Sequence, residues 1–157
     1  MFQIGDKIVH PLYGAGTIRG IEKRKDRDTT TNYYVVPDTL EADRLLVPVE
    51  NASNLRLAVS SEDAEEIIEI IRSEGHSLGE QRTERVAHCR KTDWGDPYAV
   101  AALWRDLAHE AKEKKLCAET EKMRKRARRL LLSEICLATG MSTEECGMLM
   151  DNLREKH

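Results

Sequence analysis

The stretch that decides the fold is GDKIVHPLYGAGTIRGIEKR, residues 5–24. A short apolar run ends just before Pro11, and proline, which cannot donate to a sheet ladder, lies at the end or the edge of a strand. The YGAG motif (residues 13–16) predicts a turn, because glycine accepts a positive φ or a close backbone approach. A second strand is expected over residues 17–21. This spacing favours a small, tightly curled β-barrel.

The sequence up to about residue 57 continues to predict short strands separated by turns. Further strands are expected over residues 33–36, 44–49 and 55–57, separated by a polar loop over 23–32 and a turn over 37–43. Short strands with frequent turns favour a barrel over an open sheet, because closure removes exposed strand edges.

From residue 60 the apolar period changes from two to about 3.6, which predicts helices. Helices are expected from Ser60 to Gly75, over 80–91, 98–115 and 118–139, and from residue 142 onward, with residues 75–79 as an interdomain linker. We therefore predict an α+β fold. An SH3/Tudor-like β-barrel occupies residues 1–58, and an all-α helical domain occupies residues 59–157.

The chain has 157 residues, of which 34% are charged and 40% hydrophobic. This composition predicts a soluble protein. No apolar run approaches the roughly 18–20 residues that span a bilayer, and no signal-peptide pattern opens the chain, so a cytoplasmic protein is expected. Charge is uneven: residues 1–75 hold 14 acidic and 9 basic side chains, and residues 76–157 hold 14 and 16. A mildly basic second half is compatible with nucleic-acid contact.

The sequence carries no catalytic signature. There is no G-x-S-x-G, no Walker-type loop and no H-E-x-x-H, and the histidines are scattered. The four cysteines have no C-x-x-C spacing, so buried thiols are favoured over a metal site. We expect a binding protein without enzymatic activity, cofactor, metal or small-molecule substrate.

The basic run KMRKRARR, residues 122–129, holds six cations and no acid. Rows of Lys and Arg on a helix neutralise phosphates without reading sequence. The alternative is a solvated helix face whose cations pair with Glu119 and Glu121. A second basic group, Arg82, Arg85, Arg90 and Lys91, lies on the helix expected over 80–91.

Several motifs in this order resemble the CarD/CdnL transcription regulators and the RNA-polymerase-interacting domain of transcription-repair coupling factors. They are GDKIVHP (5–11), YGAG (13–16), IE (21–22), YYVV (33–36) and LVPVEN (46–51). The resemblance extends more weakly to about residue 140. It implies a bacterial transcription regulator whose barrel binds the RNA polymerase β subunit. The helical domain would contact promoter DNA and stabilise the open complex.

The resemblance also implies roles for residues of the barrel. One family arginine, in the strand after the turn, matches Arg24. A second falls at Leu46, and Arg44, two residues away on the same strand face, is a candidate substitute. Ordinary surface charge is the alternative for both arginines. The predicted polymerase-binding residues are Arg24, Arg44 and Leu46.

In the helical domain, the helix over 118–139 corresponds to one that touches DNA in this family. The family's wedge tryptophan, which enters the minor groove, falls near Gln81, and glutamine cannot act as that wedge. Trp94 is either a displaced wedge or a side chain packed between helices, and the sequence favours packing. The predicted DNA-binding residues are Arg82, Arg85, Arg90, Lys91, Trp94, Lys122, Lys125, Arg126 and Arg129.

Two other functions stay open at this point. A diverged CarD-like protein could bind polymerase without the DNA wedge and act as a competitor or adaptor. A protein-interaction module of another system would instead not bind the polymerase β subunit.

Overall fold

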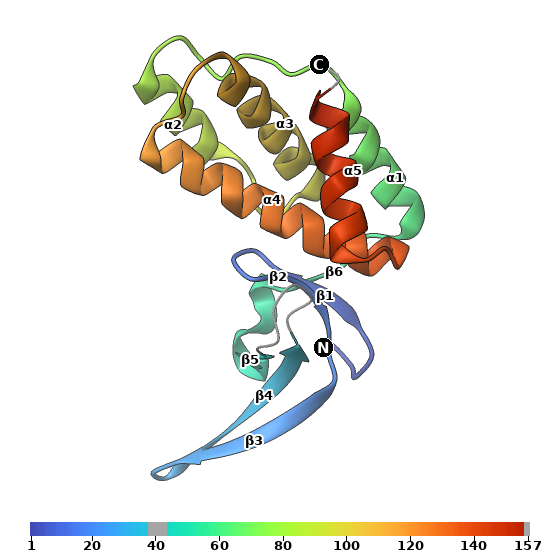
Figure 1. Cartoon of the computed structure of the whole chain (residues 1–157). Helices are drawn as coiled ribbons and strands as arrows, with labels where there is room; N and C mark the ends of the chain where they lie inside the picture. The colour runs from blue at the N-terminus through green and yellow to red at the C-terminus, as the bar shows by residue number, and fades with distance from the viewer. Residues whose placement is uncertain (38–43, 156–157) are drawn as a thin grey trace.

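Figure 1 shows the computed structural model of the chain, which describes residues 1–37 and 44–155. An N-terminal β region lies against a C-terminal helical region. The β region contains the strands β1 (Lys7–His10), β2 (Gly14–Thr17), β3 (Gly20–Asp26), β4 (Thr29–Pro37), β5 (Arg44–Pro48) and β6 (Arg56–Leu57), with a 3₁₀ segment at Val49–Asn54. The helices are α1 (Ser61–Arg72), α2 (Arg82–Lys91), α3 (Pro97–Glu113), α4 (Ala118–Thr139) and α5 (Thr143–Glu155).

The strands form two small antiparallel sheets, ordered β2-β1-β6 and β3-β4-β5. Between them lies an aliphatic core with one aromatic ring, built from Ile8, Ile18, Tyr34, Val36, Val47 and Leu55. The backbone links the sheets where Arg19 N–H donates to Val35 O at 2.9 Å. This β region followed by helices confirms the predicted α+β class.

Three of the four residues of YGAG, Gly14 to Gly16, belong to strand β2, and only Tyr13 lies in a turn. The register pairs His10 with Gly14 and Lys7 with Thr17, so the chain reverses over residues 11–13 instead. The glycines serve close packing: a Cβ on Gly16 would lie 2.5 Å from Val36 Cγ1, and one on Gly14 would lie 2.5 Å from Ser133 Oγ. A side chain at either position would push the strand off its neighbours.

The polar hairpin loop predicted over residues 23–32 is much shorter than expected, because most of that range belongs to the two strands of the hairpin. β3 continues to Asp26 and pairs with β4 from Thr29 onward. Three consecutive threonines start β4, and β-branched residues favour the extended backbone over a loop. Arg27 adopts a φ of 55° in the tight turn between them. The turn predicted over 37–43 lies, from residue 38, outside the described residues.

The helical region is one bundle that includes α1. Its core gathers Ile67 and Ile71 of α1 with Trp104 of α3 and Leu131 of α4, among others. The segment predicted as an interdomain linker, residues 75–79, therefore connects two helices of the same bundle. α1 ends at Arg72, not Gly75. The buried Arg154 of α5 accounts for this, because its Nη1 donates to Ile71 O and Ser73 O at 3.0 and 2.7 Å.

Within the described part of the chain, no helix has the length and apolar character needed to cross a membrane.

Candidate binding surfaces

The β3-β4-β5 sheet buries one face and exposes the other. Tyr34, Val36 and Val47 point into the core. Alternate residues point outward, and the register places them side by side: Gly20 is opposite Val35, which is opposite Leu46. We call this the outer sheet face, and it comprises Glu22, Arg24, Tyr33, Val35, Arg44 and Leu46. The three predicted polymerase-binding residues thus share one face.

Glu22 connects the two arginines of the outer sheet face. Its carboxylate accepts from Arg24 Nε at 3.3 Å and from Arg44 Nη1 at 3.1 Å. Both guanidinium groups stay about half exposed, with 51% and 54% of their side-chain surfaces accessible. Exposed ion pairs of this kind add little stability. Their effect is to hold two cations at a fixed spacing beside the half-buried Leu46.

Five exposed cations lie on α2 and the first half of α4. We call them the basic surface, and they are Arg82, Arg90, Lys91, Lys122 and Lys125. Arg90 forms an ion pair with Glu119, which ties the end of α2 to the first turn of α4. Beside this pair runs an open groove of about 580 Å³, lined by Arg82, Val86 and Lys91 among others. Its lining combines the apolar Val86 and Ala87 with the cations Arg82, Arg90 and Lys91.

The rest of the basic run is partly neutralised inside the fold. Arg124 makes a bidentate pair with Glu121 at 3.0 and 2.6 Å, which holds the pKa of that carboxyl below its usual value. Arg128 pairs with Asp151 at 3.3 Å. Lys122 and Lys125 remain exposed, whereas Arg124 and Arg128 pair with acids, as the alternative of a solvated helix face expects.

Arg85, Trp94 and Arg126, also among the predicted DNA-binding residues, make intramolecular contacts as well. Arg85 Nη1 donates to Gly79 O at 3.3 Å and to Glu80 O at 2.7 Å. Trp94 is half-buried, packs against the helical core, and is covered by the Arg126 guanidinium, 4.0 Å from its ring centroid. Arg126 also donates to Pro11 O at 3.0 Å, and burial lowers its pKa. The position of the Arg126 guanidinium over the Trp94 ring is the geometry of a cation–π contact.

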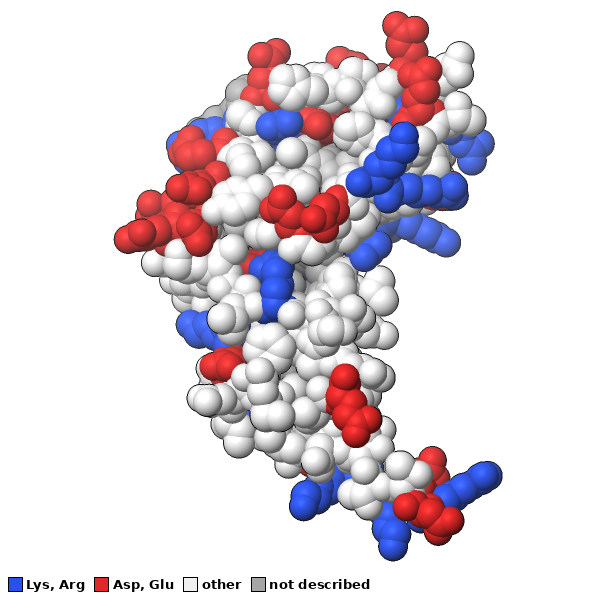
Figure 2. All heavy atoms as spheres, turned by 180° about the vertical axis from the view of Figure 1, so that it is seen from behind, with Lys and Arg blue, Asp and Glu red and all other residues white. Residues whose placement is uncertain are grey.

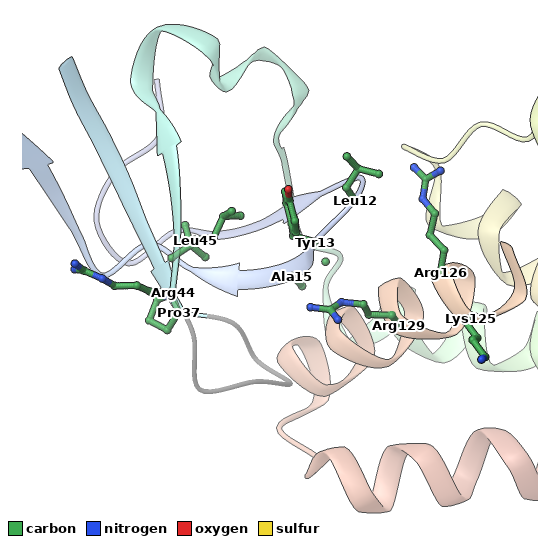
Figure 3. Close-up of a pocket in the computed structure, with 11 residues that line it drawn as sticks. Leu12, Tyr13, Ala15, Pro37, Arg44, Leu45, Lys125, Arg126 and Arg129 are labelled. Carbon is green, nitrogen blue, oxygen red and sulfur yellow. The ribbon is translucent and has the colours of Figure 1, made fainter. Parts of the chain in front are cut away.

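A cleft of about 570 Å³ lies between part of the β region and α4. Its wall on the β side holds the exposed Leu12 and Tyr13, and α4 contributes Arg129. Figure 3 shows Arg129 extending toward Ala15 across the cleft, whereas Lys125 points away from it. The lining cations therefore diverge and do not converge on one point.

Charge is polarised across the helical region. Glu62, Glu65, Glu66 and Glu69 are exposed on α1, at the end of the bundle opposite the basic surface. Seen from behind in Figure 2, most Lys and Arg side chains of this region lie on the right and most Asp and Glu side chains on the left, with a further acidic group at the upper right.

Cys117 differs from the other cysteines. It is the residue preceding α4, is half-buried, and its Sγ lies 3.2 Å from Thr120 Oγ1. The Thr120 hydrogen bond, helped by Arg82, lowers the pKa of Cys117 to about 7, whereas burial raises the pKa of Cys89 to about 11. Among the described residues, no group of His, Cys, Asp and Glu has the arrangement to hold a metal ion.

The sequence reasoning missed the residues that join the two regions. Arg56 and Glu134 form an ion pair between β6 and α4, with Nη2 and Oε1 2.6 Å apart. Ser133 Oγ accepts from Ala15 N–H at 2.9 Å. One signal was present: Ser133 and Glu134 interrupt the apolar run of α4 at positions facing inward.

The outer sheet face and the basic surface are thus two exposed, cation-bearing surfaces, one in each region of the fold. The first region, residues 2–59, matches the family model of the CarD-like/TRCF RID domain, and residues 62–151 match the CarD C-terminal domain. The chain is 30% identical over 148 residues to "Putative transcription factor YdeB" of Bacillus subtilis (strain 168), covering 92% of this chain and 97% of that protein.

The chain therefore belongs to the CarD family of transcription factors, whose first domain is an RNA-polymerase-interacting domain. Members of this family are not enzymes.

Proposed function

We propose that this protein acts in the cytoplasm as a transcription regulator, binding the RNA polymerase β subunit through its outer sheet face and promoter DNA through its basic surface. The observation that carries the first contact is the register that places Arg24, Arg44 and Leu46 together on an exposed sheet face. β3 is also the last strand of its sheet in the described chain, so a partner strand could pair with it.

The basic surface supports the DNA contact. Lys91, Lys122 and Lys125 are exposed on adjoining helices, where they can neutralise phosphates without reading bases. Binding both partners stabilises the open complex if the protein has higher affinity for it than for the closed one, because such a factor shifts the population toward the open state.

Immobilised full-length protein with the RNA polymerase β subunit in solution tests the first contact. We expect Arg24→Glu and Arg44→Glu each to weaken binding of the β subunit at least about tenfold. Each replaces a cation of the proposed docking surface by an anion, next to the existing carboxylate of Glu22. Arg72→Glu, on the exposed side of α1, is the matched control and keeps the parent affinity. If both outer-face variants bind the β subunit as tightly as the parent does, the proposed docking surface is wrong.

A second candidate function is an adaptor that binds polymerase but lacks a DNA wedge. It is favoured by Gln81, which precedes α2 at the family's wedge position, and by Trp94, which Arg126 covers. A footprint of a promoter with polymerase, with and without this protein, separates the two. Added protection upstream of the bubble supports the DNA-binding regulator, and retained polymerase binding without it supports the adaptor.

A further inference from the structure

The contact between β6 and α4 is a buried, multiply bonded ion pair. Glu134 is 3% exposed at its side chain, and both of its oxygens accept from Arg56, at 2.6 Å each. Glu134 Oε2 also accepts from Val59 N–H at 3.0 Å, and Arg56 Nε donates to Gly95 O at 2.7 Å. We call Arg56 and Glu134 the interface clamp. It ties β6 to α4 and to the turn before α3.

Further contacts lie along the same helix. Arg126 Nη2 reaches Pro11 O at 3.0 Å, Ser133 Oγ accepts from Ala15 N–H at 2.9 Å, and Lys7 Nζ lies 3.4 Å from Leu137 O. From residue 126 to residue 137 a helix advances about 16 Å. Contacts spread over that length fix the angle between the two regions as well as their separation.

We propose that the interface clamp holds the outer sheet face and the basic surface in one fixed orientation, so that Arg56 and Glu134 are positioning residues for simultaneous binding of polymerase and DNA. The proposal rests on the proposed function for its two partners. Two linked surfaces gain from high effective concentration only when their geometry lets both engage together. A preset angle also avoids losing interdomain freedom at the moment of binding.

The test variant changes both members of the clamp, Arg56→Met together with Glu134→Gln, because removing one alone leaves an unpaired buried charge. The matched control is Arg72→Met with Glu69→Gln, an exposed pair on α1 at 2.8 Å. Residual dipolar couplings are measured on backbone amides of both regions in a weakly aligned sample. We expect one alignment tensor to fit both regions in the parent and the control, and two tensors in the test variant. A single shared tensor in the test variant overturns the clamp.

The second measurement asks whether orientation matters for binding. We expect the clamp variant to keep the parent affinity for polymerase alone and for DNA alone, and to lose about tenfold in affinity for the polymerase–promoter complex. Equal losses in all three assays, or none, overturn the positioning role. A parent protein that binds neither partner overturns the proposed function, while the alignment tensors still decide whether the clamp sets the orientation.

Arg56→Lys is the second variant, used for both measurements if loss of amide dispersion shows that the double variant has unfolded. It keeps a positive charge beside Glu134 but removes the two parallel guanidinium hydrogen bonds to that carboxylate. We expect a smaller effect in the same direction, about threefold on the polymerase–promoter complex. An Arg56→Lys protein with one tensor and parent affinity would contradict the proposal.

Discussion

Gly14 shows how one missing side chain shapes the contact between the two regions. Its φ is +94°, and an added Cβ would lie 2.5 Å from Ser133 Oγ and 3.3 Å from Ser133 Cβ. We expect Gly14→Ala to lower the free energy of unfolding by about 1–3 kcal/mol, from backbone strain and overpacking together. Urea unfolding measures the change.

Gly20→Ala is the control for that substitution. Gly20 also lies in a strand of the β region, but an added Cβ would meet no atom within 4 Å, and its φ is not positive. Alanine there should leave stability unchanged or raise it slightly. A loss as large as that of Gly14→Ala would show that the contact with Ser133 is not the cause.

Cys117 allows a prediction about pH. With a pKa of about 7, half of this thiol is ionised near neutral pH, and the thiolate is the reactive form. The rate of alkylation by iodoacetamide should rise with pH through a midpoint near 7 and level off about one pH unit above that midpoint. Cys89, with a pKa of about 11 and a buried side chain, should stay unmodified in the folded protein.

Peptide mapping after timed alkylation checks this order of reactivity. Thr120→Ala removes the hydrogen bond that stabilises the thiolate, so the midpoint of the rate profile should move to higher pH. An unchanged midpoint in that variant would assign the low pKa to another cause.

At the scale of elements, residue type predicted the helices better than the strands. The apolar period of the helix over 118–139 predicts that Met123, Ala127, Leu130, Leu131 and Ile135 face inward; the last four are buried and Met123 is half-buried. A helix repeats one rule along its length, so its apolar face can be seen in the sequence. Strand β2 could not be predicted in this way, because the need for its glycines comes from the packing of Gly14 against Ser133 and of Gly16 against Val36, both distant in the sequence.

The candidate binding surfaces could likewise be predicted from the sequence only in part. Arg24 and Arg44 lie on the same face of the sheet. This placement follows from the alternation of side chains along strands, once the register is known. The roles of Arg126 and Arg85 were not visible in the sequence, because a basic residue looks alike whether it faces solvent or a backbone carbonyl. Only the packed structure shows that these two have intramolecular acceptors.

The β3–β4 hairpin offers a test at its turn. Arg27 has a φ of 55°, a region that non-glycine residues occupy at a cost. We expect Arg27→Gly to keep or raise stability, by up to about 1 kcal/mol, and Arg27→Val to lower it by about the same amount. Thermal unfolding of the two variants measures the difference. The idea fails if valine is tolerated as well as glycine.

For the whole molecule, the basic surface predicts how DNA binding depends on salt. Each phosphate contact contributes about 0.9 to the slope of log affinity against log salt concentration. Replacing Lys122 and Lys125 by alanine should therefore reduce that slope by up to about 2. Fluorescence anisotropy with a labelled duplex, over a series of salt concentrations, gives the slopes.

The matched control is a second pair of exposed lysines, Lys23 and Lys25, on the β3–β4 hairpin. Their replacement by alanine should leave the slope as in the parent. A slope that falls equally in both double variants would place the DNA contact elsewhere, or spread it over the whole surface.

The separation of acidic α1 from basic α2 and α4 has a consequence for the approach to DNA. A body with negative charge at one end and positive charge at the other has an electric dipole moment. Near a polyanionic duplex, within about 8 Å at physiological salt, the field exerts a torque on it. We therefore expect the protein to turn its α2 end toward the duplex before the proposed contact with DNA, so that fewer encounters are lost to wrong orientations during rotational diffusion.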